Sequence, residues 1–324
     1  MTKDILLNAL SGFKEKKVLV LGDIMLDEYH WCQVNRISPE APVPVCTVSR
    51  TTLSAGGAAN VAMNTSVLGQ RTYLSGIIGQ DSSGQKLKGL LDNIHTSGLL
   101  QDPQRPTILK SRIMAHQQHV ARVDREDISP ICETLKEELK QFLTHELPDS
   151  DVVILSDYLK GTLSEDFLKW IIDTCHRLHK RIVIDPKGDD YIKYKGATLL
   201  TPNLKEFEIA IGKKIKNEEE ILQYGQELIK TLSLEALLIT RSEKGMSLIS
   251  KTQKQDIPTK AKEVFDITGA GDTVIATLAV GLAHQYSLEV SALLANYAAS
   301  VAVSKIGTSA VSLSEISQAI LHDF

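Results

Sequence analysis

Short apolar runs that alternate with helical patterns constrain the fold of this chain more than any other feature. The first run, residues 17–22, ends in Gly22. Runs of similar length follow at residues 151–156, 181–185, 197–201 and 235–240. Between the later runs lie helical patterns, near residues 164–179, 203–211 and 217–231. Short runs that are apolar throughout indicate strands buried on both faces. Their alternation with helices predicts an α/β fold with a mostly parallel central sheet.

Two segments depart from this alternation. Residues 41–50 and 106–124 contain Val and Ile among polar residues and prolines, with few helix signals. We expect them to form extended strands outside the main sheet, as a small lid. Residues 269–283 and 288–304 are rich in Ala, Val and Leu at helical spacing, which predicts two packed helices. Without a visible repeat or linker, residues 1–324 are expected to form a single domain.

Composition excludes several classes of function. The 36 Lys and Arg residues are balanced by 40 Asp and Glu residues, and a net charge of -4 argues against nucleic-acid binding. The four cysteines are scattered without the spacing of a zinc site, so we expect reduced thiols. The N-terminal segment mixes charges into its apolar residues, and no apolar run approaches the length of a membrane span. These observations predict a cytoplasmic protein without a membrane partner.

The segment at residues 266–273, Asp-Ile-Thr-Gly-Ala-Gly-Asp-Thr, is the strongest local motif and precedes an apolar helix. Gly269 and Gly271 allow a sharp turn that points the backbone N–H groups around Ala270 at one place, where the helix N-terminus adds positive potential. An anion is expected there. Asp272 would then accept a proton from an acceptor hydroxyl during phosphoryl transfer. A plain helix cap after a glycine turn is the alternative.

A second glycine segment and two acidic residues suggest a site for a polyol. Gly56 and Gly57 permit close approach of a ligand to the backbone, and Asn60 offers both a donor and an acceptor. The alternative is a helix start packed tightly on the sheet. Asp23 and Asp27 follow the first strand, where two carboxylates suit adjacent sugar hydroxyls, although solvated loop acids would look the same.

A third motif opens the helical pattern near residue 203. Asn203 is an expected helix cap, and Glu206 lies at the capping-box position. Glu206 is equally suited to hold hydrated Mg²⁺, which takes few protein ligands. The chain lacks a Gly-x-x-x-x-Gly-Lys-Ser/Thr loop, the protein-kinase motifs and a Gly-x-Gly-x-x-Gly after a strand. These absences argue against P-loop, protein-kinase and dinucleotide-binding chemistry.

The three motifs, in this order and at this spacing, resemble those of the ribokinase-like (PfkB) family of carbohydrate kinases, and the resemblance covers essentially the whole chain. It implies a three-layer α/β/α sandwich with a β lid, and ATP and Mg²⁺ as cofactors. It also implies that Asp272 is the catalytic base beside an anion hole formed by the backbone of Gly269, Ala270 and Gly271.

Within the family, several segments resemble the kinases that act on D-glycero-β-D-manno-heptose 7-phosphate, namely residues 22–27, 36–45, 112–124, 185–188 and 197–208. The resemblance implies phosphorylation of the anomeric C1 hydroxyl to give the 1,7-bisphosphate, a step toward ADP-heptose for lipopolysaccharide core. Other sugar or nucleoside kinases of the family share the same motifs. A non-catalytic sugar-phosphate sensor is the alternative from another class of function.

The resemblance also implies roles for particular residues. The sugar would contact Asp23, Asp27, Gly56, Gly57 and Asn60. Its phosphate would contact the basic residues at matching positions, Lys187, Arg112 and Arg122. Gln117 and Gln118, in the expected lid, would reach the sugar.

ATP would lie along the turn at residues 240–245, through Thr240, Ser242 and Gly245, with the adenine near Asn296. Family members often bind K⁺, which here implies a site at Asp266, Thr268 and the carbonyls of residues 304–309. Lid strands of the family commonly pair, which implies a homodimer. Many relatives carry a nucleotidyltransferase domain with a His-x-Gly-His motif. That motif does not occur here, so we expect a stand-alone or excised kinase without adenylyl transfer.

Overall fold

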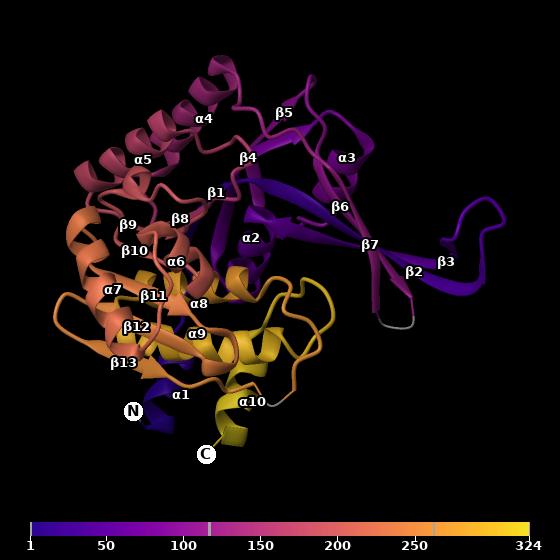
Figure 1. Ribbon diagram of the computed structural model, residues 1–324. Helices are drawn as coiled ribbons and strands as arrows, with labels where there is room; N and C mark the ends of the chain where they lie inside the picture. The colour runs from indigo at the N-terminus through magenta and orange to yellow at the C-terminus, as the bar shows by residue number, and fades with distance from the viewer. Residues whose placement is uncertain (1, 116–117, 262, 324) are drawn as a thin grey trace.

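The computed structural model describes residues 2–115, 118–261 and 263–323, and over these residues the chain forms two sheets (Figure 1). The larger has the order β13-β12-β11-β10-β9-β8-β1-β4-β5. Its strands are β1 (Lys17–Gly22), β4 (Arg71–Gly79), β5 (His95–Asp102), β8 (Val152–Ser156), β9 (Arg181–Asp185), β10 (Leu199–Leu200), β11 (Ala236–Thr240), β12 (Met246–Ser250) and β13 (Lys254–Ile257). Pairing is parallel from β11 to β5, and only β12 and β13 are antiparallel. The predicted α/β fold is confirmed.

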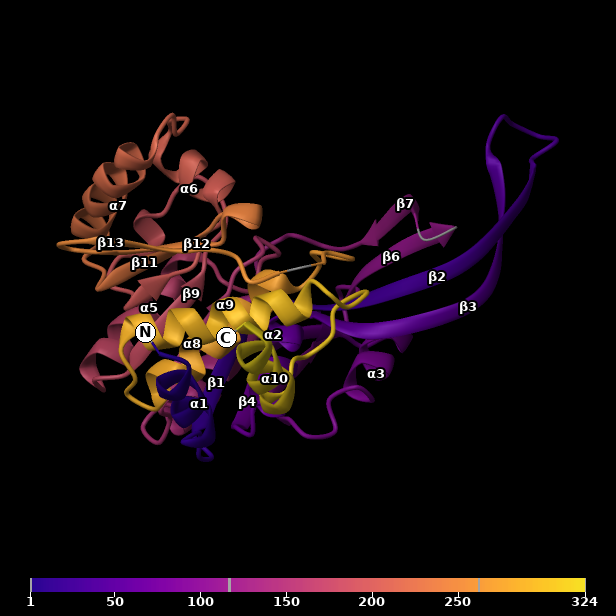
Figure 2. The same cartoon turned by 90° about the horizontal axis from the view of Figure 1, so that it is seen from below.

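Helices cover both faces of this sheet, and two separate cores result (Figure 2). One face carries α1 (Lys3–Ser11), α2 (Ala58–Val67), α8 (Ala270–Ala283), α9 (Leu288–Ala302) and α10 (Leu313–Asp323). The other carries α4 (Glu133–Glu146), α5 (Glu165–Arg177), α6 (Leu204–Ile211) and α7 (Glu218–Leu232). In β1, Val18 and Val20 pack into the first core, and Leu19 and Leu21 into the second. Alternate residues of a strand point to opposite faces, so a strand covered on both must be apolar throughout.

The smaller sheet is the lid, with the order β3-β2-β6-β7. It consists of β2 (Ile24–Ile37), β3 (Pro44–Gly57), β6 (Ile108–Ala115) and β7 (Gln118–Arg125), and the short helix α3 (Ser82–Lys88) packs beside it. The predicted lid strands are confirmed, but β3 continues to Gly57, and β2 was not predicted. Only Asp23 separates β1 from β2, so the lid continues directly from the central sheet. In Figure 2 the β2–β3 hairpin extends well beyond the helices.

The helix predictions are confirmed with small shifts of their ends, but α1, α3, α4 and α10 were not predicted. In the central sheet, β4, β5, β12 and β13 were not predicted either. Only Ile316 and Ile320 of α10 are buried, and two buried residues are too few to give the apolar periodicity that predicts a helix. None of the helices in the described part of the chain is long and apolar enough to cross a membrane.

The junction between the sheet and the lid depends on a close approach of two backbones at Gly22. A Cβ at this position would lie 2.1 Å from the carbonyl oxygen of Ser156, which accepts the Asp23 N–H at 3.1 Å. We expect Gly22→Ala to lower the free energy of unfolding by about 3 kcal/mol, the upper end of typical overpacking costs. Urea denaturation measures this.

Gly89→Ala is the matched control, because its Cβ would lie 3.4 Å from the nearest atom and its φ is -67°. The control should lose little or no stability. Equal stability losses in the two variants would contradict the close-approach explanation.

Candidate active site

The predicted site residues gather where the parallel strands of the central sheet end. Asp23 follows β1, Asp185 ends β9, and Thr240 ends β11. The N-termini of α2 and α8 meet at this edge, because Asn60 and Asp272 are joined by a hydrogen bond of 2.7 Å. Ligands of open α/β sheets bind at the carboxyl ends of the strands. The lid continues from the same edge.

Asp272 lies in the first turn of α8, and its carboxylate is buried and held from two sides. Asn60 donates to Oδ2 at 2.7 Å, and the Tyr158 hydroxyl donates to Oδ1 at 2.9 Å. Burial raises the pKa of Asp272 to about 6, although the two hydrogen bonds and Lys110 act in the opposite direction. Each oxygen keeps a further lone pair, so an acceptor hydroxyl can approach while both donors stay in place.

The glycine turn before α8 has the shape predicted for an anion site. Gly269 has a φ of 78°, and a Cβ there would lie 2.7 Å from Asn60 Nδ2. A Cβ at Gly271 would meet nothing within 4 Å, so open space lies in front of this residue. The Ala270 N–H donates to the Ile267 carbonyl at 3.3 Å. The N–H groups of Gly271 and Asp272 lie in the first turn, where a helix offers no acceptors, and they are better placed for an anion than that of Ala270.

Asp23 was predicted to bind sugar hydroxyls, but its carboxylate is fully buried and bonded to the backbone. The N–H groups of Tyr158 and Lys160 donate to Oδ2 at 2.8 and 3.0 Å, and that of Thr162 donates to Oδ1 at 3.1 Å. Burial raises the pKa of Asp23 despite these bonds. The carboxylate therefore fixes the loop that carries Tyr158, and direct sugar contact is left to other residues.

Asp27 lies on β2, on the lid, where it contacts the buried guanidinium of Arg112 from β6. Arg112 also lies over the Tyr29 ring, 5.1 Å from its centroid. A Cβ at Gly56 would be 2.4 Å from Asp27 Oδ2, and one at Gly57 would be 2.4 Å from the Asp23 carbonyl oxygen. Both glycines are thus required by close packing, as the alternative interpretation held, and this packing leaves Asp27 at the site.

Two residues at the site escaped the sequence analysis, Tyr158 and Lys110. Lys110 Nζ lies 5.2 Å from the centroid of the Tyr158 ring. Among the described residues no carboxylate lies within ion-pair distance of Lys110, and its burial lowers its pKa. Lys110 occupies the β6 position two before Arg112, on the same face of the strand, and this period-2 spacing is the signal that sequence analysis had available.

The predicted site residues on β7 make few contacts with the other site residues. Gln118 is exposed, and Arg122 is exposed and pairs with Asp124 at 2.9 Å. Gln117 lies outside the described residues.

Lys187 contacts Glu206, so it lies beside the third motif rather than among the lid residues near Arg112. Glu206 and Asn203 form a capping box, with the Asn203 N–H 2.9 Å from Glu206 Oε2 and the Glu206 N–H 2.9 Å from Asn203 Oδ1. The second Glu206 oxygen faces Lys187. Burial and the nearby charges of Glu206 and Asp272 raise the pKa of Asp185 well above its usual range.

The predicted nucleotide turn follows β11. Ser242 has a φ of 51° and Gly245 one of 83°, and a Cβ at Gly245 would lie 2.1 Å from the Ile257 carbonyl oxygen. Thr240 bonds through its N–H to the Pro202 carbonyl at 3.0 Å, which joins the turn to the third motif.

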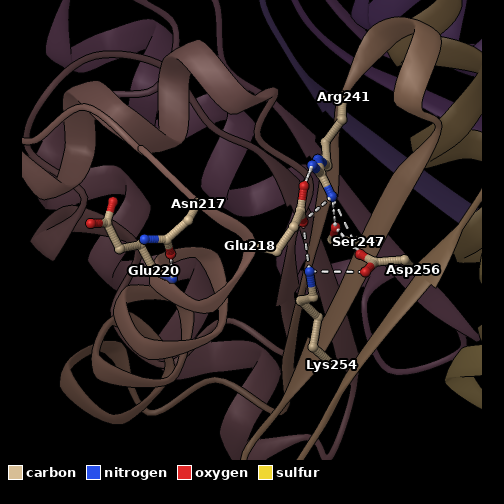
Figure 3. Close-up of polar contacts among 7 residues, drawn as sticks. All are labelled: Asn217, Glu218, Glu220, Arg241, Ser247, Lys254 and Asp256. Atoms are coloured by element: carbon tan, nitrogen blue, oxygen red, sulfur yellow. Dashed lines mark hydrogen bonds and ion pairs between the residues drawn. The ribbon is translucent and has the colours of Figure 1, made fainter.

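Arg241, which sequence analysis did not single out, lies in this turn, and its side chain joins the turn to Glu218 and Ser247 (Figure 3). Its guanidinium contacts Glu218 in the first turn of α7, and it donates to Ser247 Oγ at 2.9 Å. Lys254 joins Glu218 to Asp256 at 2.8 and 2.9 Å. Hydrogen bonds from Arg241 and Lys254 lower the pKa of Glu218 to about 2. Glu218 therefore stays ionised at neutral and mildly acidic pH.

The remaining predicted residues lie on the C-terminal helices and their connections. Asn296 is buried and donates to the Pro258 carbonyl at 2.8 Å. Asp266 accepts from the backbone and hydroxyl of Thr268 at 2.9 and 2.7 Å, and from the Gly307 N–H at 3.0 Å. Burial opposes ionisation of Asp266, but these bonds outweigh it and lower its pKa.

Two solved carbohydrate kinases share this fold. Ribokinase of Arabidopsis thaliana complexed with ribose and ATP superposes with a TM-score of 0.76 at 20% identity, covering 95% of this chain and 99% of that one. Phosphofructokinase-2 from Escherichia coli in complex with potassium gives 0.80 at 18% identity, covering 95% and 98%. The chain therefore has a ribokinase-like fold.

Sequence comparison then gives the family. The profile of the pfkB family carbohydrate kinases matches residues 15–315, and the chain belongs to this family. It is 43% identical over 318 residues to the bifunctional protein HldE of Syntrophotalea carbinolica, covering 97% of this chain and 65% of that protein. It is 47% identical over 312 residues to the bifunctional protein HldE of Haemophilus influenzae, covering 95% and 64%. The chain therefore spans less than two thirds of the length of these relatives.

The pKa of Asp272 predicts how stability depends on pH. A folded-state pKa of about 6, above the ordinary 3.8, means that the folded protein holds this proton more tightly than the unfolded chain. The associated stability is present below pH 4 and is lost as the pH rises to 6 and beyond. Asp272→Asn stays neutral, so it should be more stable than the wild type at pH 7.5, by about 1–3 kcal/mol, and nearly equal at pH 4. Urea denaturation at both pH values tests this. A stability difference that is the same at both would contradict it.

Proposed function

We propose that this chain transfers the γ-phosphoryl group of ATP to the anomeric C1 hydroxyl of D-glycero-β-D-manno-heptose 7-phosphate. The product is the 1,7-bisphosphate, on the route to ADP-heptose for lipopolysaccharide core. The observation that carries the proposal is the buried carboxylate of Asp272, held by two donors beside a helix N-terminus that opens onto free space. Membership in the family and the relatives at 43 and 47% identity support it.

The chemistry follows from the positions of these groups. Asp272 takes the proton of the C1 hydroxyl as the sugar oxygen forms its bond to the γ-phosphorus. The bond between that phosphorus and the bridging oxygen of ADP breaks, and ADP leaves with the electron pair. The N–H groups of Gly271 and Asp272, at the positive end of α8, stabilise the charge on the transferring group. A pKa of about 6 leaves Asp272 mostly ionised near neutral pH while keeping it a useful base.

The sugar is proposed to lie between the lid and α2. Asp27 offers a carboxylate from β2, and Asn60 supports the base from α2. Gly56 and Gly57 keep the backbone close to these groups. Asp23 contributes indirectly, by holding the loop after β8.

The 7-phosphate is proposed to bind basic residues of the lid. Lys110 and Arg112 lie on one face of β6, with Arg122 paired opposite Arg112 on β7. Lys110 is well suited to a phosphate because it is desolvated and lacks a carboxylate partner in the described chain, so a dianion would relieve the cost of its burial. Lys187 was first assigned to this phosphate. Its contact with Glu206, the residue proposed to reach Mg²⁺, supports a role at the phosphates of ATP instead.

ATP is proposed to lie along the turn of Thr240, Ser242 and Gly245. The adenine would lie near Asn296. About one helical turn farther along α9, Ser300 and Val301 line a cavity of ≈ 330 Å³. Among the described residues no group of three or more His, Cys, Asp or Glu is arranged to hold a metal. This fits Mg²⁺, which keeps most of its waters and is carried by the ATP phosphates, with Glu206 reaching it through water. Bound there, Mg²⁺ would neutralise phosphate charge.

Two further features belong to the proposal. Asp266 and Thr268, next to the glycine turn, would form the K⁺ site together with carbonyls of residues 304–309, and the phosphofructokinase-2 structure in complex with potassium supports this. A homodimer would form through the lid, where Val43, Val48 and Val123 are each more than half exposed. Sedimentation equilibrium tests whether this homodimer forms.

The central test is product analysis with Asp272→Asn as the control. The wild type should form ADP and a bisphosphate whose new phosphate is on C1, as shown by ³¹P NMR. Asp272→Asn keeps the size of the side chain but loses the base, so turnover should fall by about 10²–10⁴-fold while ATP affinity stays within a few-fold. Wild-type turnover by the variant would remove Asp272 from the mechanism.

Lys110 and Lys187 should give opposite kinetic signatures. Lys110→Met should raise KM for heptose 7-phosphate about ten- to a hundredfold, with a smaller change in kcat, because it removes a charge-assisted contact to a group that does not react. Lys187→Met should mainly lower kcat, since charge builds up on the γ-phosphate during transfer.

Steady-state kinetics with each substrate varied in turn separates these effects, and Lys230→Met on the exposed side of α7 is the control for loss of charge. A raised KM for the sugar phosphate in Lys187→Met, with kcat unchanged, would restore Lys187 to the 7-phosphate.

A further inference from the structure

The loop after β8 connects three elements of the site through one side chain, Tyr158. Its hydroxyl donates to Asp272 Oδ1 at 2.9 Å, and its N–H donates to Asp23 Oδ2 at 2.8 Å. The face of its ring meets Lys110 of the lid, with Nζ 5.2 Å from the centroid. No other residue of the described chain joins the base, the end of β1 and the lid in this way.

The loop that carries Tyr158 is held firmly. Asp23 accepts three N–H groups from residues 158–162, and Asp157 accepts the Leu159 N–H at 2.8 Å and the Tyr194 hydroxyl at 2.6 Å. Leu159 has a φ of 56°, which is unfavourable for a residue with a side chain. A Cβ at Gly161 would lie 2.0 Å from the Ser129 carbonyl oxygen. A strained conformation persists only where the surroundings fix it, and such strain is concentrated at functional sites.

We infer that Tyr158 is a positioning residue for the base. Its hydroxyl, on a loop fixed by Asp23, holds the Asp272 carboxylate in its ionised form and in the orientation that receives the sugar proton. Asn60 fixes one carboxylate oxygen from α2, and Tyr158 fixes the other from the opposite side of the site. With both oxygens fixed, the carboxylate cannot rotate about its Cβ–Cγ bond, and orientation contributes to the rate.

The same contact affects the protonation of Asp272. The groups that face this carboxylate are Asp27 from β2, Lys110 from β6, Asp185 at the end of β9, Asn60 and Tyr158. The two acids favour protonation of Asp272, and the cation and the two hydrogen-bond donors favour ionisation. Tyr158 is the only one of these groups whose contribution can be removed by deleting a single oxygen atom, with the ring kept in place under Lys110.

The inference rests on the proposed function for its kinetic readout, and a direct titration makes it independent of that function. Tyr158→Phe should raise the midpoint of the Asp272 titration, followed by ¹³C NMR of the labelled carboxyl, by about one pH unit. In the kinase assay, the acid limb of the profile of kcat/KM against pH should move up by the same amount. The activity should fall about fivefold more at pH 6 than at pH 8. KM for ATP should stay unchanged.

Tyr286→Phe is the matched control, because it also deletes a hydroxyl that makes one hydrogen bond, to the Ala9 carbonyl at 2.9 Å, away from the site. It should leave both the titration and the pH profile as in the wild type. Asp23→Asn, which offers one acceptor oxygen fewer to the loop, should shift the Asp272 titration in the same direction as Tyr158→Phe.

The possible outcomes are distinct. A wild-type midpoint in Tyr158→Phe overturns the positioning role, whatever the effect on thermal stability. An active wild type together with a shifted midpoint supports both proposals. A shifted midpoint in a protein that phosphorylates no sugar would support the positioning role and reject the proposed function.

Discussion

The arrangement of the candidate site depends most on one constraint, which is that a buried carboxylate must be able to ionise where water is excluded. Desolvation of Asp272 favours its neutral form, and the surrounding elements oppose that tendency with directed donors. Asn60 comes from the helix that follows the lid, and Tyr158 comes from the loop after a central strand. Both donors have defined positions only because α2, α8 and the sheet pack together. The packing of the fold therefore sets the geometry of the site.

A second constraint is the direct passage of β1 into β2. Since Asp23 alone separates the two strands, the lid starts at a fixed point of the sheet, and the residues at that point have little freedom. The close approaches at Gly22, Gly56 and Gly57 all lie within this junction. They place Asp27 on the lid and Asp23 in the sheet, so two acids only four residues apart have different surroundings and different roles.

The turn after β11, where we propose that ATP binds, is held by different interactions. There a turn with two residues of positive φ follows β11, and the ion pairs of Arg241, Glu218, Lys254 and Asp256 support it. Ion pairs with shared partners lose less side-chain entropy than isolated pairs, and Arg241 is buried among them. The turn is thereby held in a conformation that is unfavourable for Ser242, whose φ is 51°.

Much of the fold was predictable from local pattern. The strands of the central sheet are apolar throughout because helices cover both faces, and caps such as Asn203 with Glu206 act within four residues. The glycine turn before α8 was likewise predicted from its own residues, because Gly269 has a φ of 78°, which favours glycine. The strand β2 was missed, since its outer half is exposed and its polar residues hide the period-2 pattern. The small helix α10 was missed because only two of its residues are buried.

Local sequence patterns were sufficient to predict the α/β class, the lid, the glycine turn, and Asp272 as the acid beside that turn. They were sufficient because each of these features depends on residues that are neighbours in the chain. The side-chain contacts between distant parts of the chain could be identified only in the tertiary structure. It assigned Asp23 to the loop of Tyr158, paired Asp27 with Arg112, placed Lys187 against Glu206 and brought Tyr158 to Asp272. These partners are 19 to 135 residues apart in sequence, and no local pattern specifies which polar groups burial will bring together.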